Sequence, residues 1–243
     1  MRKKENSKFA GAQIVLADKR TLRMDDIVRT NKSGTRLTMK GVLGGKTVFI
    51  KYYRGVLGVI RGMKTKKSAL RLRSVAADSA PELLYADRHQ WFKGFYLVYT
   101  EIPGEKSLSE FKNARHKKEA IIALEQTVAL IARLHDGGAI QRDTNLTNFM
   151  QYNNNIYLLD DDDIVVYKGP VKGSMGAANL ASILARIEWL DCKQLAALIS
   201  CYYNMRWGRP GRPEEIDYFI VRVNQEKALR AKKRAKESVH QKR

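Results

Sequence analysis

Composition and charge set the first limits on this chain. Its 243 residues, 44% of them hydrophobic, can bury a core in one domain or in two lobes. The formal net charge of +20 indicates an anionic partner, such as nucleic acid, lipid headgroups or a phosphorylated polymer. No apolar run reaches the roughly 18 residues that span a bilayer, and the basic start has no apolar segment behind it, so we expect no secretory signal. Cys192 and Cys201 offer neither a disulfide framework nor zinc-ligand spacing.

The N-terminal third predicts antiparallel strands. A first strand is expected within 17–30, and Arg36–Val42 alternates polar and apolar residues as a half-buried strand does. A hairpin turn at Gly44-Gly45 then leads into a strand over Thr47–Tyr53, in which Lys51 follows the apolar run Val48-Phe49-Ile50.

The turn at Asn31–Thr35 has two interpretations. Backbone amides at Ser33 and Gly34 could cradle a phosphate. A plain turn explains this stretch equally well.

The next segment is strongly basic. Nine Lys or Arg residues and no Asp or Glu lie between Lys46 and Ala77. A helix is predicted over 63–77, with Leu70, Leu72 and Val75 as its inward face.

Strands are predicted at 83–86 and 94–100, and the pattern breaks at Thr100–Gly104. Pro103 and Gly104 end the second strand and leave backbone groups beside Glu101 free for the edge of an adenine ring. We therefore place a lobe boundary here, with an N-terminal lobe over 1–102 and a C-terminal lobe over 103–243.

The second half begins with helical signals. Ser107 and Glu110 have the spacing of a capping box at the start of a short helix. The segment 117–136 has apolar residues at helical spacing and ends at Gly137-Gly138. His135 lies at the end of this helix, where packing or capping explains it better than catalysis.

The segment after this helix carries the main chemical signal. Asp143 is followed five positions later by Asn148, and then by a short apolar run that ends at Asp160. In phosphoryl transfer, one carboxylate accepts the proton of an attacking hydroxyl, while an amide oxygen and a second carboxylate hold Mg²⁺ against nucleotide phosphates.

The acidic run Asp160–Asp163 strengthens the metal interpretation. Adjacent carboxylates repel one another by about 1 kcal/mol per pair even in water, which favours a bound cation over a solvated acidic turn. Asp160 is the best-placed ligand, and Asp162 lies on the same side and is the second choice.

The order of these motifs resembles the lipopolysaccharide core kinases, that is, the Kdo kinase and WaaP-type heptose kinase family. The resemblance runs from about residue 28 to 190 and includes the Val48–Lys51 strand, Arg142-Asp143 and Asn148, and the Asp160–Asp162 run. It implies an α+β, bilobal protein-kinase-like fold, with a small antiparallel sheet in the N-lobe and a mainly helical C-lobe.

The same resemblance implies an activity and site residues. The protein would be an ATP- and Mg²⁺-dependent kinase that phosphorylates an alcohol group of a heptose or Kdo sugar. Asp143 would be catalytic, Asn148 and Asp160 would bind Mg²⁺, and Lys51 would contact the ATP phosphates. The expected location is cytoplasmic and peripheral to the inner membrane.

Three positions depart from the kinase pattern. The helix that supplies a Glu partner to the strand Lys has none here, Gln141 replaces the usual His, and Asp162 stands where a Gly is expected. An amide can still hydrogen-bond to the backbone near the metal-binding strand, so we expect Gln141 to keep a scaffold role.

The C-terminal region is predicted to be helical at 179–189, 193–205 and 226–236. The loop 206–213 carries three arginines that could contact substrate phosphates, or it is a solvent-exposed connector. The basic tail 226–243 could lie on an anionic membrane leaflet or be a solvated end.

Two other functions stay open at this point. One is a small atypical protein kinase that works with RNA or a protein complex, although the sequence has no aromatic-rich RNA-binding motif. The other is a pseudokinase that serves as a binding module, which the missing helix Glu and Gln141 would explain.

Overall fold

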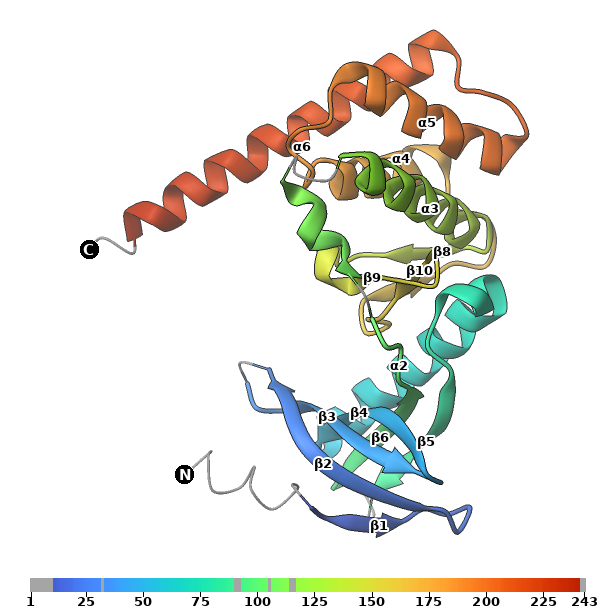
Figure 1. Cartoon of the computed structure of the whole chain (residues 1–243), viewed down its shortest axis with the longest axis vertical. Helices are drawn as coiled ribbons and strands as arrows, with labels where there is room; N and C mark the ends of the chain where they lie inside the picture. The colour runs from blue at the N-terminus through green and yellow to red at the C-terminus, as the bar shows by residue number, and fades with distance from the viewer. Residues whose placement is uncertain (1–10, 32, 90–92, 105, 114–116, 241–243) are drawn as a thin grey trace. The chain divides into compact units, whose positions relative to one another are not determined.

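The chain divides into two compact units, residues 1–103 and 104–243, and each is described by itself (Figure 1). The computed structural model describes residues 11–31, 33–89, 93–104, 106–113 and 117–240.

The N-terminal unit is an antiparallel sheet with one long helix. The strand order is β1-β2-β3-β4-β6-β5, and every neighbouring pair is antiparallel. The strands are β1 Gln13–Val15, β2 Thr21–Thr30, β3 Arg36–Leu43, β4 Lys46–Arg54, β5 Leu83–His89 and β6 Gly94–Thr100. The helix α2, Gly55–Ala76, and the short 3₁₀ helix η1, Ala77–Ser79, connect β4 to β5. The strands predicted from the pattern are confirmed, except that the short β1 was missed.

The two faces of β4 belong to different hydrophobic clusters. Val48, Ile50 and Tyr52 pack with residues of β2 and β3, whereas Tyr53 packs with residues of α2 and β6. Because side chains alternate across a strand, Lys51 lies on the same face as Tyr53, which α2 covers.

The helix α2 differs from the predicted one. It begins at Gly55, eight residues before the expected start, and Leu70 is 53% exposed instead of facing inward. Its buried face carries small residues, including Gly58 and Gly62. A Cβ at Gly62 would lie 2.7 Å from the Phe95 side chain, so glycine allows this close approach to the sheet.

The C-terminal unit is mainly helical. Its helices are α3 Lys117–Asp136, α4 Gly173–Leu184, α5 Cys192–Trp207 and α6 Pro213–His240, with 3₁₀ helices η2 Leu108–Lys112 and η4 Leu146–Asn148. Its short strands are β7 Lys106–Ser107, β8 Ala139–Gln141, β9 Phe149–Tyr152, β10 Asn155–Leu158 and β11 Ile164–Val166. They form two small sheets, with the orders β10-β9-β7 and β11-β8.

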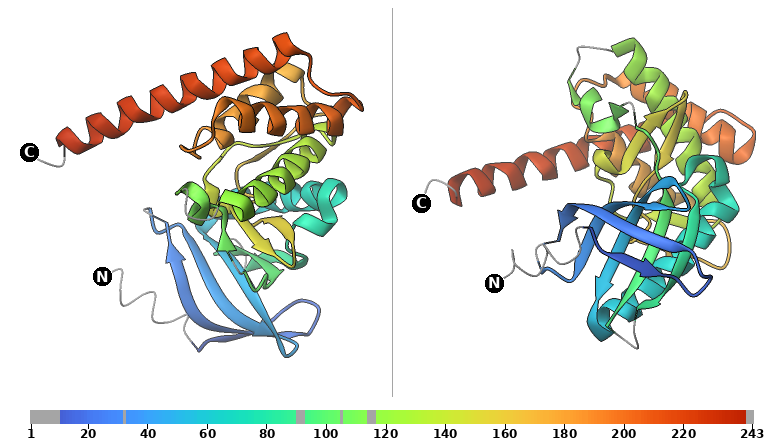
Figure 2. Two further views of the ribbon diagram at one scale, coloured as in Figure 1. Left: turned by 45° about the horizontal axis from the view of Figure 1, so that its top comes forward. Right: turned by 60° about the horizontal axis from the view of Figure 1, so that its bottom comes forward.

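Helix α3 lies at the centre of this unit. It packs against α5, α4 and strands β8 and β10, and its apolar face from Ala120 to His135 is buried (Figure 2). The predicted bounds of this helix are confirmed, as is the capping box between Ser107 and Glu110. Both are local signals: regular apolar spacing with a glycine stop, and a reciprocal side-chain cap.

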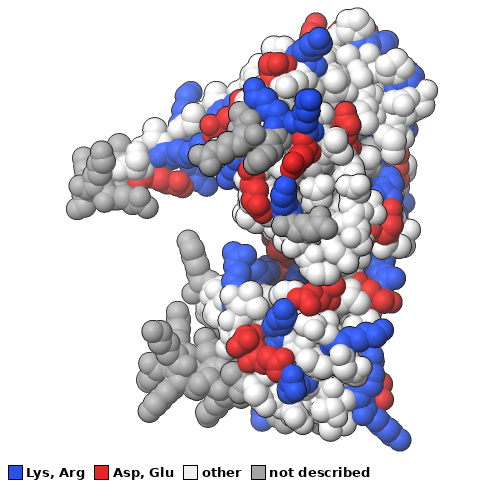
Figure 3. Space-filling view, viewed as in Figure 1, with Lys and Arg blue, Asp and Glu red and all other residues white. Residues whose placement is uncertain are grey.

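The later helices differ from their predicted bounds. Helix α4 begins at Gly173 and ends at Leu184, earlier than expected at both ends, and α6 begins at Pro213, well before residue 226. The C-terminal part of α6 is exposed, and Lys and Arg side chains with some acidic residues lie along it (Figure 3). Among the described residues, no helix is both long enough and apolar enough to cross a membrane.

Candidate active site

The loop after β8 positions Asp143 and Asn148. Gly138, with a φ of 72°, ends the turn after α3, and β8 then leads into this loop. The Asp143 Oδ1 atom accepts a hydrogen bond of 3.1 Å from the backbone N–H of Asn145. The Asn148 side-chain amide donates one of 3.1 Å to the backbone carbonyl of Asp143. These contacts fix both side chains within one short loop.

A second segment, Leu159–Asp163, lies beside this loop. The backbone N–H of Leu159 donates to the carbonyl of Asn148 at 2.8 Å, and that of Arg142 donates to the carbonyl of Asp163 at 3.0 Å. The strands β8 and β11 continue this pairing, with Gln141 opposite Ile164. The fold of the C-terminal unit therefore places the loop with Asp143 and Asn148 beside the segment that begins the acidic run at Asp160.

Gln141 connects the two segments through its side chain. Its Nε2 atom donates a hydrogen bond of 2.6 Å to the backbone carbonyl of Asp160, and the residue is fully buried. The expectation that an amide at this position still binds the backbone near the metal-binding strand is met.

Buried polar groups extend this connection to α3. Asn179 Nδ2 donates to the Gln141 carbonyl at 2.7 Å, so its Oδ1 faces His135 Nε2 at 3.1 Å as an acceptor. The His135 ring therefore carries its proton on Nε2 and accepts a hydrogen bond of 2.7 Å from the Tyr202 hydroxyl at Nδ1. Burial lowers the pKa of His135 to about 4, so the ring is neutral. The packing interpretation of His135 agrees with these contacts.

The acidic run supplies carboxylates for a cation. Oxygen atoms of Asp160, Asp161 and Asp162 lie within 4.8 Å of one another. Asp161 is buried, and the backbone N–H of Asp162 donates to Asp160 Oδ1 at 3.2 Å. The Asn148 amide nitrogen is the atom that binds the Asp143 carbonyl, and among the described residues no donor to its Oδ1 atom is present.

This donor set fits Mg²⁺, a hard cation that is bound by carboxylate and amide oxygens. Sequence reasoning placed Asp160 and Asp162 in it and omitted Asp161. A bound Mg²⁺ would neutralise charge on nucleotide phosphates, and the residues that would hold it are Asn148 and the Asp160–Asp162 carboxylates.

The other predicted site residues lie in the N-terminal unit. Lys51 is buried on β4, opposite Thr38 on β3, and its Nζ atom lies 5.5 Å from the centre of the Tyr99 ring. Helix α2, on the same face of the sheet, contains no acidic residue. The folded helix therefore lacks the Glu that pairs with the strand Lys in the kinase pattern.

The turn before β3 is closed by its own hydrogen bonds. The backbone N–H of Gly34 donates to the Asn31 carbonyl at 2.9 Å, and Gly34 has a φ of 71°. The Ser33 hydroxyl lies 2.8 Å from that of Thr35 and 3.0 Å from the Asn31 amide. This geometry favours the plain-turn interpretation, because the Gly34 amide already has an acceptor.

Glu101 directly follows β6 and lies at the other end of the sheet from the turn before β3. Its carboxylate forms an ion pair of 2.8 Å with Lys40 on β3. Any contact of this segment with an adenine edge would therefore come from the backbone of 101–103 and not from the Glu101 side chain.

Comparison with known proteins tests the fold. No protein-family model matches the chain, and no curated protein matches its sequence. Among solved structures, the chain is similar to the crystal structure of the BubR1 kinase domain, with a TM-score of 0.53 and 15% sequence identity. The alignment covers 83% of this chain and 66% of that kinase domain, just under two thirds of its length.

This chain has a protein-kinase-like fold. The antiparallel sheet with α2 corresponds to a kinase N-lobe, and the helical unit with the Asp143 loop corresponds to a C-lobe. The predicted α+β, bilobal fold class is confirmed. A fold shared at 15% identity does not select a substrate, and no family match identifies a lipopolysaccharide kinase.

The C-lobe also contains a site residue that sequence reasoning missed. Arg186, just after α4, donates from Nε and Nη2 to the Thr144 hydroxyl, at 3.4 Å each. Burial lowers the pKa of Arg186, as does the nearby Arg230, while the charge of Asp143 raises it. A guanidinium thus lies beside the Asp143 loop, and no spacing in the sequence pointed to it because the two are 43 residues apart.

The arginines of 206–213, in contrast, are bound within the C-lobe. Arg206 is almost fully buried and pairs with Asp136 at 2.9 Å. Arg209 pairs with Glu215 through two hydrogen bonds of 2.7 and 2.8 Å, and Arg212 donates to the same carboxylate at 3.1 Å. These contacts make the loop a structural connector and argue against its interpretation as a free phosphate-binding cluster.

Proposed function

We propose that this protein is an ATP-dependent phosphotransferase that phosphorylates an alcohol group of a sugar, a heptose or Kdo of the lipopolysaccharide inner core. The kinase-like fold supports the reaction type. The observation that carries the proposal is the set of three hydrogen bonds, from Gln141, Arg142 and Leu159, that holds the Asp143 loop against the Asp160 segment.

Each site residue has a role in this reaction. Asp143 orients the acceptor hydroxyl and accepts its proton, so that the oxygen bonds to the γ-phosphorus of ATP as the bond from that phosphorus to ADP breaks. Asn148 with Asp160 and its neighbouring carboxylates holds Mg²⁺. Lys51 contacts the α- and β-phosphates of ATP, and the backbone near Glu101 contacts the adenine.

The choice of acceptor is supported by charge and by sequence resemblance. The net charge of +20 favours an anionic substrate or surface, and lipopolysaccharide precursors are anionic. The exposed basic part of α6 would hold the protein at the cytoplasmic face of the inner membrane, where each basic residue near an anionic leaflet is worth about 1 kcal/mol.

The test is transfer of labelled phosphate from ATP to core-truncated lipopolysaccharide in the presence of Mg²⁺. We expect transfer by the wild type and loss of at least about 100-fold in Asp143→Asn, since general-base contributions are typically of this size or larger. Asp217→Asn, an exposed change on α6, is the charge-matched control and should retain full activity. Equal transfer by the wild type and Asp143→Asn, or none by the wild type, would overturn the proposal.

A second function is favoured by one observation, the absence of any acidic residue in α2. Without a carboxylate from this helix, the protein could be a pseudokinase that binds partners without catalysis. A rise in melting temperature with ATP that requires Mg²⁺ and disappears in Asp160→Asn would argue against this alternative. No nucleotide effect at all would favour it.

A further inference from the structure

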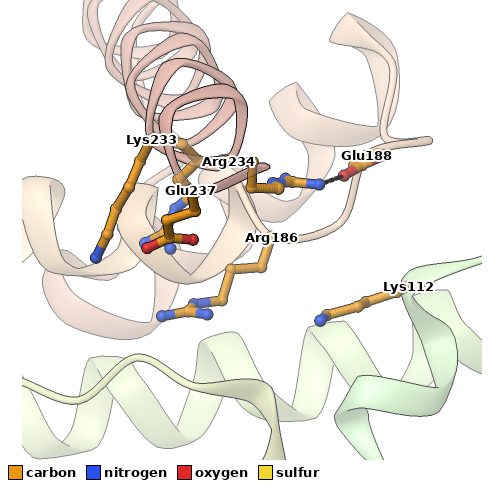
Figure 4. Close-up of a pocket in the computed structure, with 7 residues that line it drawn as sticks. Lys112, Arg186, Glu188, Lys233, Arg234 and Glu237 are labelled. Carbon is orange, nitrogen blue, oxygen red and sulfur yellow. Dashed lines mark hydrogen bonds and ion pairs between the residues drawn. The ribbon is translucent and has the colours of Figure 1, made fainter. Parts of the chain in front are cut away.

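The C-lobe contains a basic pocket of about 360 Å³ that the proposed chemistry does not use (Figure 4). It is lined from three segments: η2, the connection between α4 and α5, and α6. Its cationic side chains are Lys112, Arg186, Arg230, Lys233 and Arg234, and its acidic ones are Glu188 and Glu237. The lining therefore carries an excess of three positive charges.

The pocket borders the Asp143 loop through a chain of polar contacts. Arg186, in its wall, donates to the Thr144 hydroxyl, which lies 3.1 Å from the Ser182 hydroxyl. Arg230, also in the wall, donates to the same Ser182 hydroxyl at 2.8 Å. Two of the five cations are thus fixed relative to the residue that follows Asp143.

The pocket's charge is only partly neutralised within the protein. Glu188 is paired with Arg234 at 2.7 Å. Lys112 and Lys233 have no hydrogen-bond or ion-pair partner among the described residues, and both are exposed. Arg186 and Arg230 lie in the same wall and carry like charges, and the pKa of Arg186 is lowered first by burial and second by the charge of Arg230.

A bound anion would relieve the repulsion between these like charges. Guanidinium groups and lysine ammonium groups are the usual protein ligands of phosphate. A volume of about 360 Å³ lies within the roughly 300–1,000 Å³ range of small-molecule sites. It suits a phosphate together with a sugar ring better than an extended polymer.

We propose that this pocket binds a phosphate group on the acceptor, so that the protein acts on an alcohol that is already phosphorylated. Binding there holds the acceptor beside the loop that presents Asp143. The substrate class is a phosphorylated sugar or a saccharide that carries one. This inference rests on the proposed function and specifies its acceptor.

Binding of model phosphates to charge-matched variants tests the proposal. Lys112→Gln with Lys233→Gln removes two unpaired cations of the pocket. Lys118→Gln with Lys232→Gln removes two exposed cations from α3 and α6 outside it. Calorimetric titrations use glucose 6-phosphate, inorganic phosphate and glucose, with Mg²⁺ and a non-hydrolysable ATP analogue present to occupy the nucleotide site.

We expect glucose 6-phosphate and inorganic phosphate to bind the wild type and the control variant with the same affinity. Their affinity for the pocket variant should be about tenfold lower, because that variant loses charge-assisted hydrogen bonds to the phosphate. Glucose should not bind measurably. Equal affinity of all three proteins for glucose 6-phosphate, or no binding to the wild type, would overturn the proposal.

The phosphate could belong to a sugar or to a lipid headgroup, and a measurement of binding to vesicles separates these two sources. Phosphatidylcholine vesicles with and without phosphatidic acid are added to the same proteins. Selective weakening in the pocket variant would show that a lipid-borne phosphate also enters the pocket and would support the proposal. Vesicle binding reduced equally in both variants, without a selective loss for glucose 6-phosphate, would indicate general surface charge and overturn it.

Failure of the pocket and failure of the proposed function are distinguishable. Nucleotide binding is followed separately as the Mg²⁺-dependent rise in melting temperature and its loss in Asp160→Asn. A normal nucleotide response with identical phosphate binding in all proteins would remove the pocket proposal alone. If phosphate binds selectively but ATP and Mg²⁺ do not raise the melting temperature, the pocket proposal is supported and the proposed kinase function is contradicted.

Discussion

The side-chain amide of Gln141 donates a hydrogen bond of 2.6 Å to the backbone carbonyl of Asp160. This side-chain contact joins the end of β8 to the backbone of the first residue of the acidic run. The other amide atom, Oε1, is buried and has no partner among the described residues. Gln141 is therefore present as a donor, and a side chain with an N–H in the same place could replace it.

Gln141→Leu should reduce stability because it leaves the Asp160 carbonyl without its donor. Loss of a partner for a buried polar group costs about 1–3 kcal/mol, offset in part by removal of the unpaired Oε1. Gln141→His should lose less, since an imidazole N–H can donate to the same carbonyl. Urea unfolding of both variants checks this prediction, together with the rise in melting temperature that ATP causes in the presence of Mg²⁺. A Leu variant as stable as the wild type would contradict a scaffold role.

Stability should fall as the pH drops below the ordinary range of histidine, because His135 is buried in neutral form. Its pKa is lowered to about 4 in the folded protein, whereas the unfolded chain binds the proton near 6.5. The stabilising contribution is therefore present above pH 6.5 and is lost as the pH falls toward 4. Between pH 7 and pH 5 the loss from this group should be about 2 kcal/mol.

Comparison with variants separates His135 from other titrating groups. His135→Gln should be less stable than the wild type at pH 7, but its stability should decrease less between pH 7 and pH 5, measured by urea unfolding. His89, whose pKa is also lowered by burial, is the comparison: His89→Gln should retain most of the pH dependence. An unchanged pH dependence in His135→Gln would contradict a neutral, buried ring.

The elements that could be predicted from sequence depend on local signals. The bounds of α3 follow from its apolar spacing and the glycines after it, and the β9–β10 hairpin follows from three consecutive asparagines, two of which have positive φ. The pattern of Asp143, Asn148 and Asp160 could also be recognised in the sequence, because each of these residues directly precedes or closely follows a short strand of the C-terminal unit.

What could not be predicted depends on tertiary packing. Gly55, Gly58 and Gly62 weaken helix propensity, so the pattern placed the start of α2 too late. In the structure Gly58 and Gly62 allow close contact with Tyr53 and Phe95 of the sheet, and Gly55 adopts a positive φ of 71° at the start of the helix. The basic pocket could not be predicted for a related reason, because Lys112, Arg186 and Lys233 come from three distant segments. From the sequence alone, the cations of α6 indicate either a membrane-binding tail or a solvated end.

Gly62→Ala should destabilise the N-lobe, although alanine favours helix more than glycine does. The added Cβ would lie 2.7 Å from Phe95, and overpacking of this kind costs about 1–3 kcal/mol against a propensity gain of up to about 1 kcal/mol. Gly173→Ala in α4, where an added Cβ meets no atom within 4 Å, should be neutral or slightly stabilising. Thermal unfolding of the two variants checks this pair, and equal stability would contradict the close packing of α2.

Thr144 should affect acceptor binding more than the chemical step, because its hydroxyl positions Arg186 and does not contact the reacting atoms. Thr144→Val keeps the shape of the side chain but removes the hydroxyl that accepts from the Arg186 guanidinium. The variant also loses the contact of this hydroxyl with Ser182, which connects it to Arg230. The KM for a phosphorylated acceptor should rise about fivefold, with kcat changed less. Thr144→Ser retains the hydroxyl and should restore the KM. A fall in kcat at constant KM, or no rescue by serine, would show that Thr144 acts on the Asp143 loop itself and not through the pocket.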